Sequence, residues 1–259
     1  MGRILILSLL CIGAIAQDRG AEAWKVLEDG LSDERNSERR ARAVLALGLA
    51  GGVKGRKLAE GSLSDANPEV RVAAVQALAE MDARAAIPKI KAALDDEDAG
   101  VVFAAAQALW DLGDRSSRGV LTDVALGERS GSGGEFMGKY RKRSTLIKIG
   151  SRQGASILLG PFSMPFFMAA ELMKDHGAAA RAVAADALAE DRDPRSIKTL
   201  EQAAFDTNWA VRVTALRALA HRRAGGSIPT IAPAMYHSNE TVRFTAAAAV
   251  IRIGAKRAR

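Results

Sequence analysis

Apolar residues recur at helical spacing along almost the whole chain, in segments that turn-forming residues separate. In one such segment, Val70, Ala73, Ala74, Ala77 and Leu78 fall on the same face of a helix. Small alanines dominate this face, so neighbouring helices can pack closely. No segment shows the alternation of apolar and polar residues that is typical of a sheet strand. The pattern therefore predicts an all-α protein.

The helical segments repeat with a fixed period, which is clearest in their arginines. The intervals from Arg40 to Arg71, from Arg181 to Arg212 and from Arg212 to Arg243 are each 31 residues. A fixed period in this range is typical of a stacked-repeat solenoid, in which each unit buries its apolar face against its neighbours. We therefore predict an α-solenoid of about seven stacked helix pairs, since the chain is long enough for that number.

Two polar positions accompany each arginine. The residue four positions before it suits a helix N-cap, and these residues are Asn36, Asn67, Asp98, Gly177, Asn208 and Asn239. The residue six positions before it is acidic except in the last repeat, and these residues are Glu34, Asp65, Asp96, Asp175, Asp206 and His237. An acid and an arginine at constant offset can form a ladder of charge-assisted hydrogen bonds between successive repeats. The ladder departs from this pattern at Val102, which takes the place of an arginine, and at His237.

The repeated unit, with its N-cap, its arginine and its preceding acid, resembles HEAT repeats. It is closest to the short HEAT-like repeats named after phycobilin lyases. The resemblance implies that the acid and the arginine are structural and link adjacent repeats. It also implies that the second helix of each pair lines a concave surface on which partners commonly lie. The period fails between about residues 116 and 175, where we expect an irregular central repeat.

The first sixteen residues have the three parts of a secretory signal peptide. Arg3 precedes the apolar run Ile4–Ile15, and Ala14-Ile15-Ala16 fits a cleavage site. The apolar run is too short to span a bilayer, and a buried first helix is the alternative. We predict an exported protein, periplasmic or secreted, whose residues 17–259 form a single solenoid. Cys11 is the only cysteine, so the mature chain would have no disulfide, thiolate metal site or cysteine nucleophile.

The chain shows no constellation of residues for catalysis. The segment 133–139 matches the spacing of a phosphate-binding loop, but Tyr140 stands where a Ser or Thr is required and no strand precedes it. The three histidines lack a metal-ligand spacing. The carboxylates of Asp186 and Glu190, four residues apart, fit a solvated face better than a cation site. We therefore predict a protein that is not an enzyme and that uses no cofactor, metal or evident small-molecule substrate.

The charge is uneven along the chain. Residues 1–130 carry a net charge of −3 and residues 131–259 a net charge of +10, which give the net +7 of the whole. The basic half suits an anionic partner, or is a soluble surface without a specific role. The irregular repeat combines a cationic cluster with aromatic residues that either form an exposed contact surface or fill the core. These residues are Lys139, Arg141, Lys142, Arg143, Phe162, Phe166 and Phe167.

A second candidate surface is the stripe formed by the residues five and nine positions after each arginine position. The spacing puts each pair on one face of its helix. The pairs are Leu45/Leu49, Gln76/Glu80, Gln107/Asp111, Asp186/Glu190, Arg217/His221 and Ala248/Arg252. In chain order the stripe changes from apolar through acidic to basic, so an extended ligand could bind along it in one orientation. The alternative is an ordinary polar face. Trp209, at a first helical position, is a further contact candidate or lies over the neighbouring repeat.

These features predict an exported, non-enzymatic scaffold that binds a partner protein on the solenoid surface. An acidic protein is one candidate for that partner. One alternative is a binder of membrane head groups or polyanions through the basic half. Export argues against nucleic acid as that polyanion, because chromosomal DNA stays inside the cell. The other alternative is a lyase-like enzyme, as the resemblance suggests. An exported chain that shows no sign of a tetrapyrrole pocket fits this role poorly.

Overall fold

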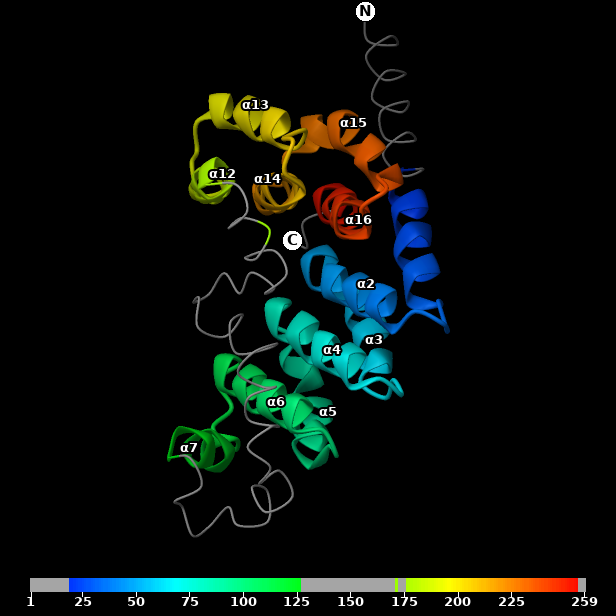
Figure 1. Ribbon diagram of the computed structural model, residues 1–259, viewed down its shortest axis with the longest axis vertical. Coiled ribbons are helices and arrows are strands. Elements are labelled where there is room, and N and C mark those ends of the chain that lie inside the picture. Colours follow the sequence, from blue (N-terminus) through cyan, green and yellow to red (C-terminus); the bar gives the residue numbers. More distant parts are fainter. Residues whose placement is uncertain (1–18, 127–170, 172–175, 256–259) are drawn as a thin grey trace, which may run out of the picture. The chain divides into compact units, whose positions relative to one another are not determined.

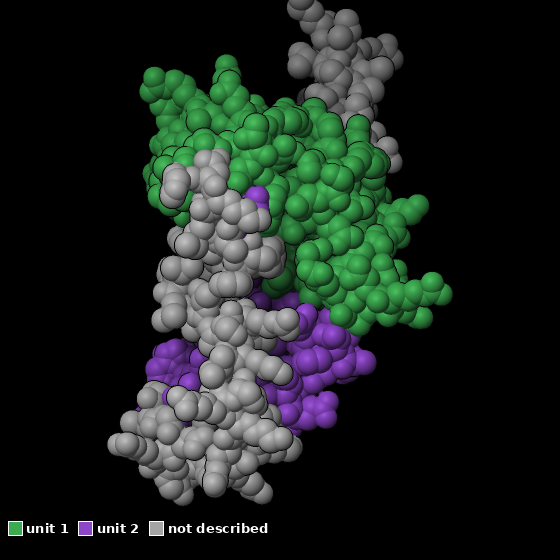
Figure 2. Space-filling view, viewed as in Figure 1, with its two compact units in different colours: residues 1–51, 172–259 green, residues 52–171 purple. Residues whose placement is uncertain are grey.

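The computed structural model describes residues 19–126, 171 and 176–255, and all regular structure in them is helical (Figure 1). This confirms the all-α fold. The described residues form two compact units by their packing, 19–51 with 176–255 and 52–126 with 171 (Figure 2). We call them unit 1 and unit 2. No helix among the described residues is both long and apolar enough to cross a membrane.

Unit 2 contains successive helix pairs. Its elements are α3 (Gly52–Ser62), α4 (Pro68–Glu80), η1 (Arg84–Ala86), α5 (Ile87–Ala92), η2 (Ala93–Asp95), α6 (Ala99–Asp111) and α7 (Arg118–Leu126). Helix α3 packs on α4, α5 packs on α6, and the second helices α4 and α6 pack on each other. Leu78 and Leu109 are fully buried in this core, together with Ile90 from α5. The stacking follows the order of the chain.

Unit 1 combines the beginning and the end of the chain. Its elements are helix 19–31, α2 (Ser37–Ala50), α12 (His176–Ala187), α13 (Pro194–Ala203), α14 (Trp209–His221), η4 (Gly225–Ser227), α15 (Ile228–Ile231), η5 (Ala232–Tyr236) and α16 (Glu240–Gly254). Figure 1 shows α13 and α15 in one layer and α12, α14 and α16 in another. The second helices pack in the order α12, α14, α16, α2. The first repeat of the chain therefore stacks on the last one.

A buried aromatic ring makes the contact between the last and first repeats. Phe244 of α16 is 1% exposed. A Cβ atom on Gly30 would lie 2.6 Å from the Phe244 Cζ atom and 2.8 Å from the Cβ atom of Ala43. Only glycine fits at this point, because real Cβ atoms do not approach other atoms so closely. The absence of a side chain at Gly30 lets the ring of the last repeat enter the first repeat.

Local signals in the sequence set the helix starts. Five of the predicted N-cap residues accept a hydrogen bond from a backbone N–H in the first turn of their helix, as N-caps do. They are Asn36, Asn67, Asp98, Asn208 and Asn239. The sixth prediction is wrong, since Gly177 lies inside α12, which begins at His176. Gly51 and Gly113 end α2 and α6 at the same repeat position with positive φ angles of 67° and 86°, which glycine adopts without steric cost.

Candidate interaction surface

The arginine of the repeat forms a buried contact between α4 and the following repeat. Arg71 donates from Nε to Asp96 Oδ2 at 2.8 Å and from Nη2 to Asp96 Oδ1 at 2.7 Å. Its Nη1 donates to the Asp65 carbonyl oxygen at 2.9 Å. The Arg71 side chain is 9% exposed, and its hydrogen bonds to the Asp96 carboxylate raise the pKa of the guanidinium. A forked pair of this kind fixes both position and orientation of the neighbouring repeat.

The same contact recurs in unit 1 at a more exposed place. Arg181 donates from Nε to Asp206 Oδ2 at 2.7 Å and from Nη2 to Asp206 Oδ1 at 3.0 Å. The Arg181 side chain is 42% exposed. Its hydrogen bonds lower the pKa of the Asp206 carboxyl. In both rungs the arginine thus contacts the acid that begins the next repeat, as the spacing predicts.

Arg40 donates to the carbonyl oxygens of Asp33 and Glu34 in its own turn, as Arg71 does to that of Asp65. Two other positions of the ladder differ from Arg71 and Arg181. Val102 is buried in α6. Arg212 lies against the ring of His237, which stands in the place of the acid. Asp175 lies outside the described residues.

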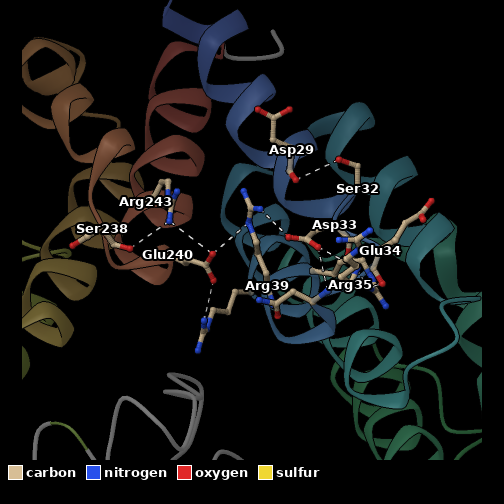
Figure 3. A network of polar contacts seen from close by, with 12 residues as sticks. Asp29, Ser32, Asp33, Glu34, Arg35, Arg39, Ser238, Glu240 and Arg243 are labelled. Atoms are coloured by element: carbon tan, nitrogen blue, oxygen red, sulfur yellow. Dashed lines mark hydrogen bonds and ion pairs between the residues drawn. The ribbon is translucent and has the colours of Figure 1, made fainter.

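A carboxylate network replaces the ladder where the last repeat meets the first (Figure 3). Glu240 of α16 lies 3.3 Å from Arg39 Nε and 3.0 Å from Arg42 Nη1, both of α2. Arg243 approaches the same carboxylate at 3.8 Å. Arg39 also pairs with Asp33 at 2.9 Å, which lowers the pKa of that carboxyl. Sequence reasoning missed Glu240, because no signal of the period indicates a pair of residues so far apart in the chain.

The predicted stripe behaves differently in unit 1 from what chain order suggests. The helices pack in the order α12, α14, α16, α2, so the acidic pair Asp186/Glu190 adjoins Arg217/His221, and the apolar pair comes last. Leu49 and Ala248 are buried. Arg252 is structural, since its Nη1 donates to the Leu49 carbonyl oxygen at 3.2 Å near the end of α2, where a cation is favourable. The predicted order of the stripe, from apolar through acidic to basic, is therefore wrong for this unit.

In unit 2 the predicted stripe lies at the surface. Most of α4 and α6 is buried, but Gln76 and Gln107 are half-buried and Glu80 and Asp111 are exposed. These two pairs lie on helices that pack on each other and occupy the same positions of the repeat. Partial desolvation by neighbouring protein atoms raises the pKa of the Asp111 carboxyl, although its side chain remains exposed.

An aromatic residue that sequence reasoning missed lies within this stripe. Trp110, near the end of α6, is 37% exposed. It follows Gln107 by three residues and directly precedes Asp111. The guanidinium of Arg115 lies over its ring, 4.0 Å from the centroid, and Arg115 Nη1 donates to the Trp110 carbonyl oxygen at 2.7 Å. The corresponding position is small in most other repeats, where it is Gly48, Ala79, Ala189 and Ala220. A large residue at a position that is small in most repeats is the signal in the sequence that indicates Trp110. We call Gln76, Glu80, Gln107, Trp110, Asp111 and Arg115 the Trp110 surface.

Comparison with known families agrees with this geometry. The family model for HEAT repeats matches residues 55–131 and 202–259, which is more than half of the chain. The chain belongs to the HEAT-repeat family. No curated protein gives a significant match. The finer resemblance of these HEAT repeats to those of phycobilin lyases stays a prediction.

Several predicted contact residues of the HEAT-repeat protein cannot be placed. Lys139, Arg141, Lys142, Arg143, Phe162, Phe166 and Phe167 lie outside the described residues, as does the signal-peptide segment 1–16. Binding of an anionic surface through those cations therefore stays a prediction. Trp209 is half-buried at the start of α14. Within the described ranges, no three His, Cys, Asp or Glu side chains are grouped so that they could share a metal ion.

Proposed function

We propose that this HEAT-repeat protein is an exported, non-enzymatic scaffold that holds a partner protein on unit 2, with Trp110 at the centre of the contact. HEAT repeats commonly serve as protein-interaction scaffolds, which supports the general role. The observation that carries the location is the Trp110 ring. It stands on the second-helix layer of unit 2 at a position where most other repeats have Gly or Ala.

The arrangement around Trp110 has the features of a binding hot spot. Tryptophan and arginine are enriched among the few interface residues that carry most of the binding free energy. Arg115 covers one face of the ring and is tied to the helix end by its hydrogen bond, so both side chains lose little freedom on binding. The amides of Gln76 and Gln107 and the carboxylates of Glu80 and Asp111 supply polar groups around the aromatic centre. This surface suits an apolar side chain of the partner with hydrogen-bond donors around it.

Trp110→Ala tests this location. We expect at least a thirtyfold loss of affinity for the partner, about 2 kcal/mol or more, as for other hot-spot tryptophans. The free energy of unfolding should fall by about 1–2 kcal/mol, less than for a fully buried aromatic ring, because Trp110 is 37% exposed and its stacking on Arg115 is an exposed cation–π contact. The partner is first recovered by affinity capture on the mature protein and identified by mass spectrometry. Its dissociation constant is then measured for each variant.

The chain offers a matched control for this substitution. Phe205, in the turn after α13 of unit 1, is also a large exposed ring, at 58%. Phe205→Ala removes a comparable apolar ring from the other unit and should leave the affinity unchanged. Equal affinities for the wild type and both variants would contradict the proposed location. Loss of affinity in Phe205→Ala alone would place the contact on unit 1.

Export is a separate part of the proposal with its own test. If Ala14-Ile15-Ala16 is cleaved, the exported protein begins at Gln17 and contains no thiol, because Cys11 is removed. The intact mass of the protein recovered from outside the cytoplasm measures this directly. We expect a mass that lacks residues 1–16 and no reaction with a thiol reagent. An exported form that still carries Cys11 would contradict cleavage at this site.

A further inference from the structure

One contact of the arginine ladder has a histidine in place of the acid. His237 lies between η5 and α16, and its Nε2 atom faces Arg212 Nη1 of α14. Its Nδ1 atom lies 2.9 Å from the backbone nitrogen of Asn239, which donates to it. Arg212 also donates through Nε to the Asp206 carbonyl oxygen in its own turn. The histidine therefore takes both positions that an aspartate takes in the other rungs.

The aspartates show what the position requires. Asp96 Oδ1 accepts from the Asp98 backbone N–H at 2.8 Å, and the same carboxylate accepts two hydrogen bonds from Arg71. Asp206 Oδ1 accepts from the Asn208 backbone N–H at 2.8 Å, and its carboxylate likewise accepts from Arg181. The position thus needs an acceptor toward the backbone and a second acceptor toward the arginine. A carboxylate satisfies both needs.

A neutral imidazole cannot accept at both places, because one of its two nitrogens always carries a hydrogen. When Nδ1 accepts from Asn239, Nε2 carries the proton and faces a donor of Arg212. When Nε2 accepts from Arg212, Nδ1 faces the Asn239 N–H with a hydrogen of its own. Protonation of the ring removes the last acceptor and places a second cation beside the guanidinium. The contact is therefore half-satisfied when His237 is neutral and unsatisfied when it is charged.

The charges around the ring are positive. Burial lowers the pKa of His237, and so do the nearby guanidinium groups of Arg212 on α14 and Arg243 on α16. The acidic residues in the turn before α14 and at the start of α16 have other partners: Asp206 pairs with Arg181, and Glu240 pairs with Arg39 and Arg42 of α2. Neither of these contacts supplies the negative charge that a protonated His237 would need.

We propose that the contact between α14 and α16 is a pH-sensitive joint, held while His237 is neutral and weakened when His237 takes up a proton. The folded state binds this proton less readily than the unfolded chain does. Stability is therefore fully present above the ordinary histidine pKa of about 6.5 and decreases as the pH falls below it. The same helix α16 carries Phe244 and Glu240, so weakening the joint also loosens the helix on which the first repeat packs.

Hydrogen exchange of the mature chain between about pH 8 and pH 5 tests the joint. After correction for the intrinsic effect of pH, we expect the protection of α16 amides to fall in the wild type as the pH decreases through the ordinary histidine pKa of about 6.5, because the unfolded chain binds the proton more readily than the folded one. The amides of α4 and α6 serve as an internal control, because Arg71 and Asp96 join those helices without a histidine. Their protection should stay constant over this range.

Two substitutions at the same position sharpen the test. His237→Asp restores the pairing seen at the other rungs, and His237→Asn keeps an acceptor toward Asn239 without a titrating group. Both variants should lose the fall in α16 protection, and His237→Asp should also be more protected than the wild type at every pH. His221→Asn is the matched control at an exposed histidine of the same unit and should keep the wild-type pH dependence. Two results would overturn the proposal: the same fall in His237→Asn as in the wild type, or an equal fall in α4 and α6.

Discussion

Phe244→Ala is expected to lower the free energy of unfolding by about 3–5 kcal/mol, because it empties a space filled by a fully buried aromatic ring. The ring belongs to α16 but fills space against Gly30 and Ala43 of the first repeat. The loss should therefore appear as exposure of residues 19–51 as well as of the last repeat. Chemical denaturation measures the free energy, and limited proteolysis at low denaturant concentration reports which segment becomes accessible.

Gly30→Ala is the complementary change, because it adds the atom for which the ring leaves no room. We expect it to cost about 1–3 kcal/mol through overpacking. Combining Gly30→Ala with Phe244→Leu, which frees part of that volume, should cost less than the sum of the two single changes. Gly20→Ala serves as control, since a Cβ atom there would meet no other atom within 4 Å. Strictly additive costs for Gly30→Ala and Phe244→Leu would contradict the direct contact between the first and last repeats.

The contact between the ends of the chain shows what the sequence could and could not predict about the fold. The period of 31 residues and the residues Asn67 and Asn208 predict where second helices begin, because N-capping is a local interaction. The order in which the repeats stack, in contrast, does not depend on a local interaction. Every repeat presents a similar alanine-rich face, so the pattern indicates that faces pack but not which ones pack together. The pairing of Gly30 with Phe244 involves neither the period nor a local rule.

The sequence likewise predicts some contacts of the candidate site and not others. The offset between acid and arginine predicts the contacts of Arg71 and Arg181, because a constant spacing in sequence gives a constant position in each repeat. Chain order predicts the direction of the polar stripe, and this prediction fails in unit 1 because α2 packs on α16. Trp110 lies eight positions after the arginine position of its repeat, so the stripe of residues at five and nine positions does not include it. Its exposure depends on the packing of α6, which the sequence does not specify.

Arg71→Ala is expected to lower the free energy of unfolding by about 3 kcal/mol. The side chains of Arg71 and Asp96 are only 9% and 13% exposed, so the substitution leaves a carboxylate with little access to water and without the guanidinium that neutralises it. Arg71→Lys should recover part of this loss, because an ammonium supplies the charge but cannot donate in the same forked geometry.

Arg181→Ala is the matched control for Arg71→Ala, since it removes the same forked pair with Asp206 at a place where the arginine is 42% exposed. Water and salt screen the pair from the side of Arg181, but the Asp206 side chain is only 13% exposed, as that of Asp96 is, so we expect a smaller loss of about 1–2 kcal/mol, and less at high salt. Urea denaturation of the two variants and the wild type gives both values. Binding of the partner should fall in Arg71→Ala only as far as folding does. An Arg71→Ala protein that unfolds like the wild type but no longer binds would show that this arginine contacts the partner and does not join the repeats. Equal losses of stability in the two variants would show that burial does not set the strength of the ladder.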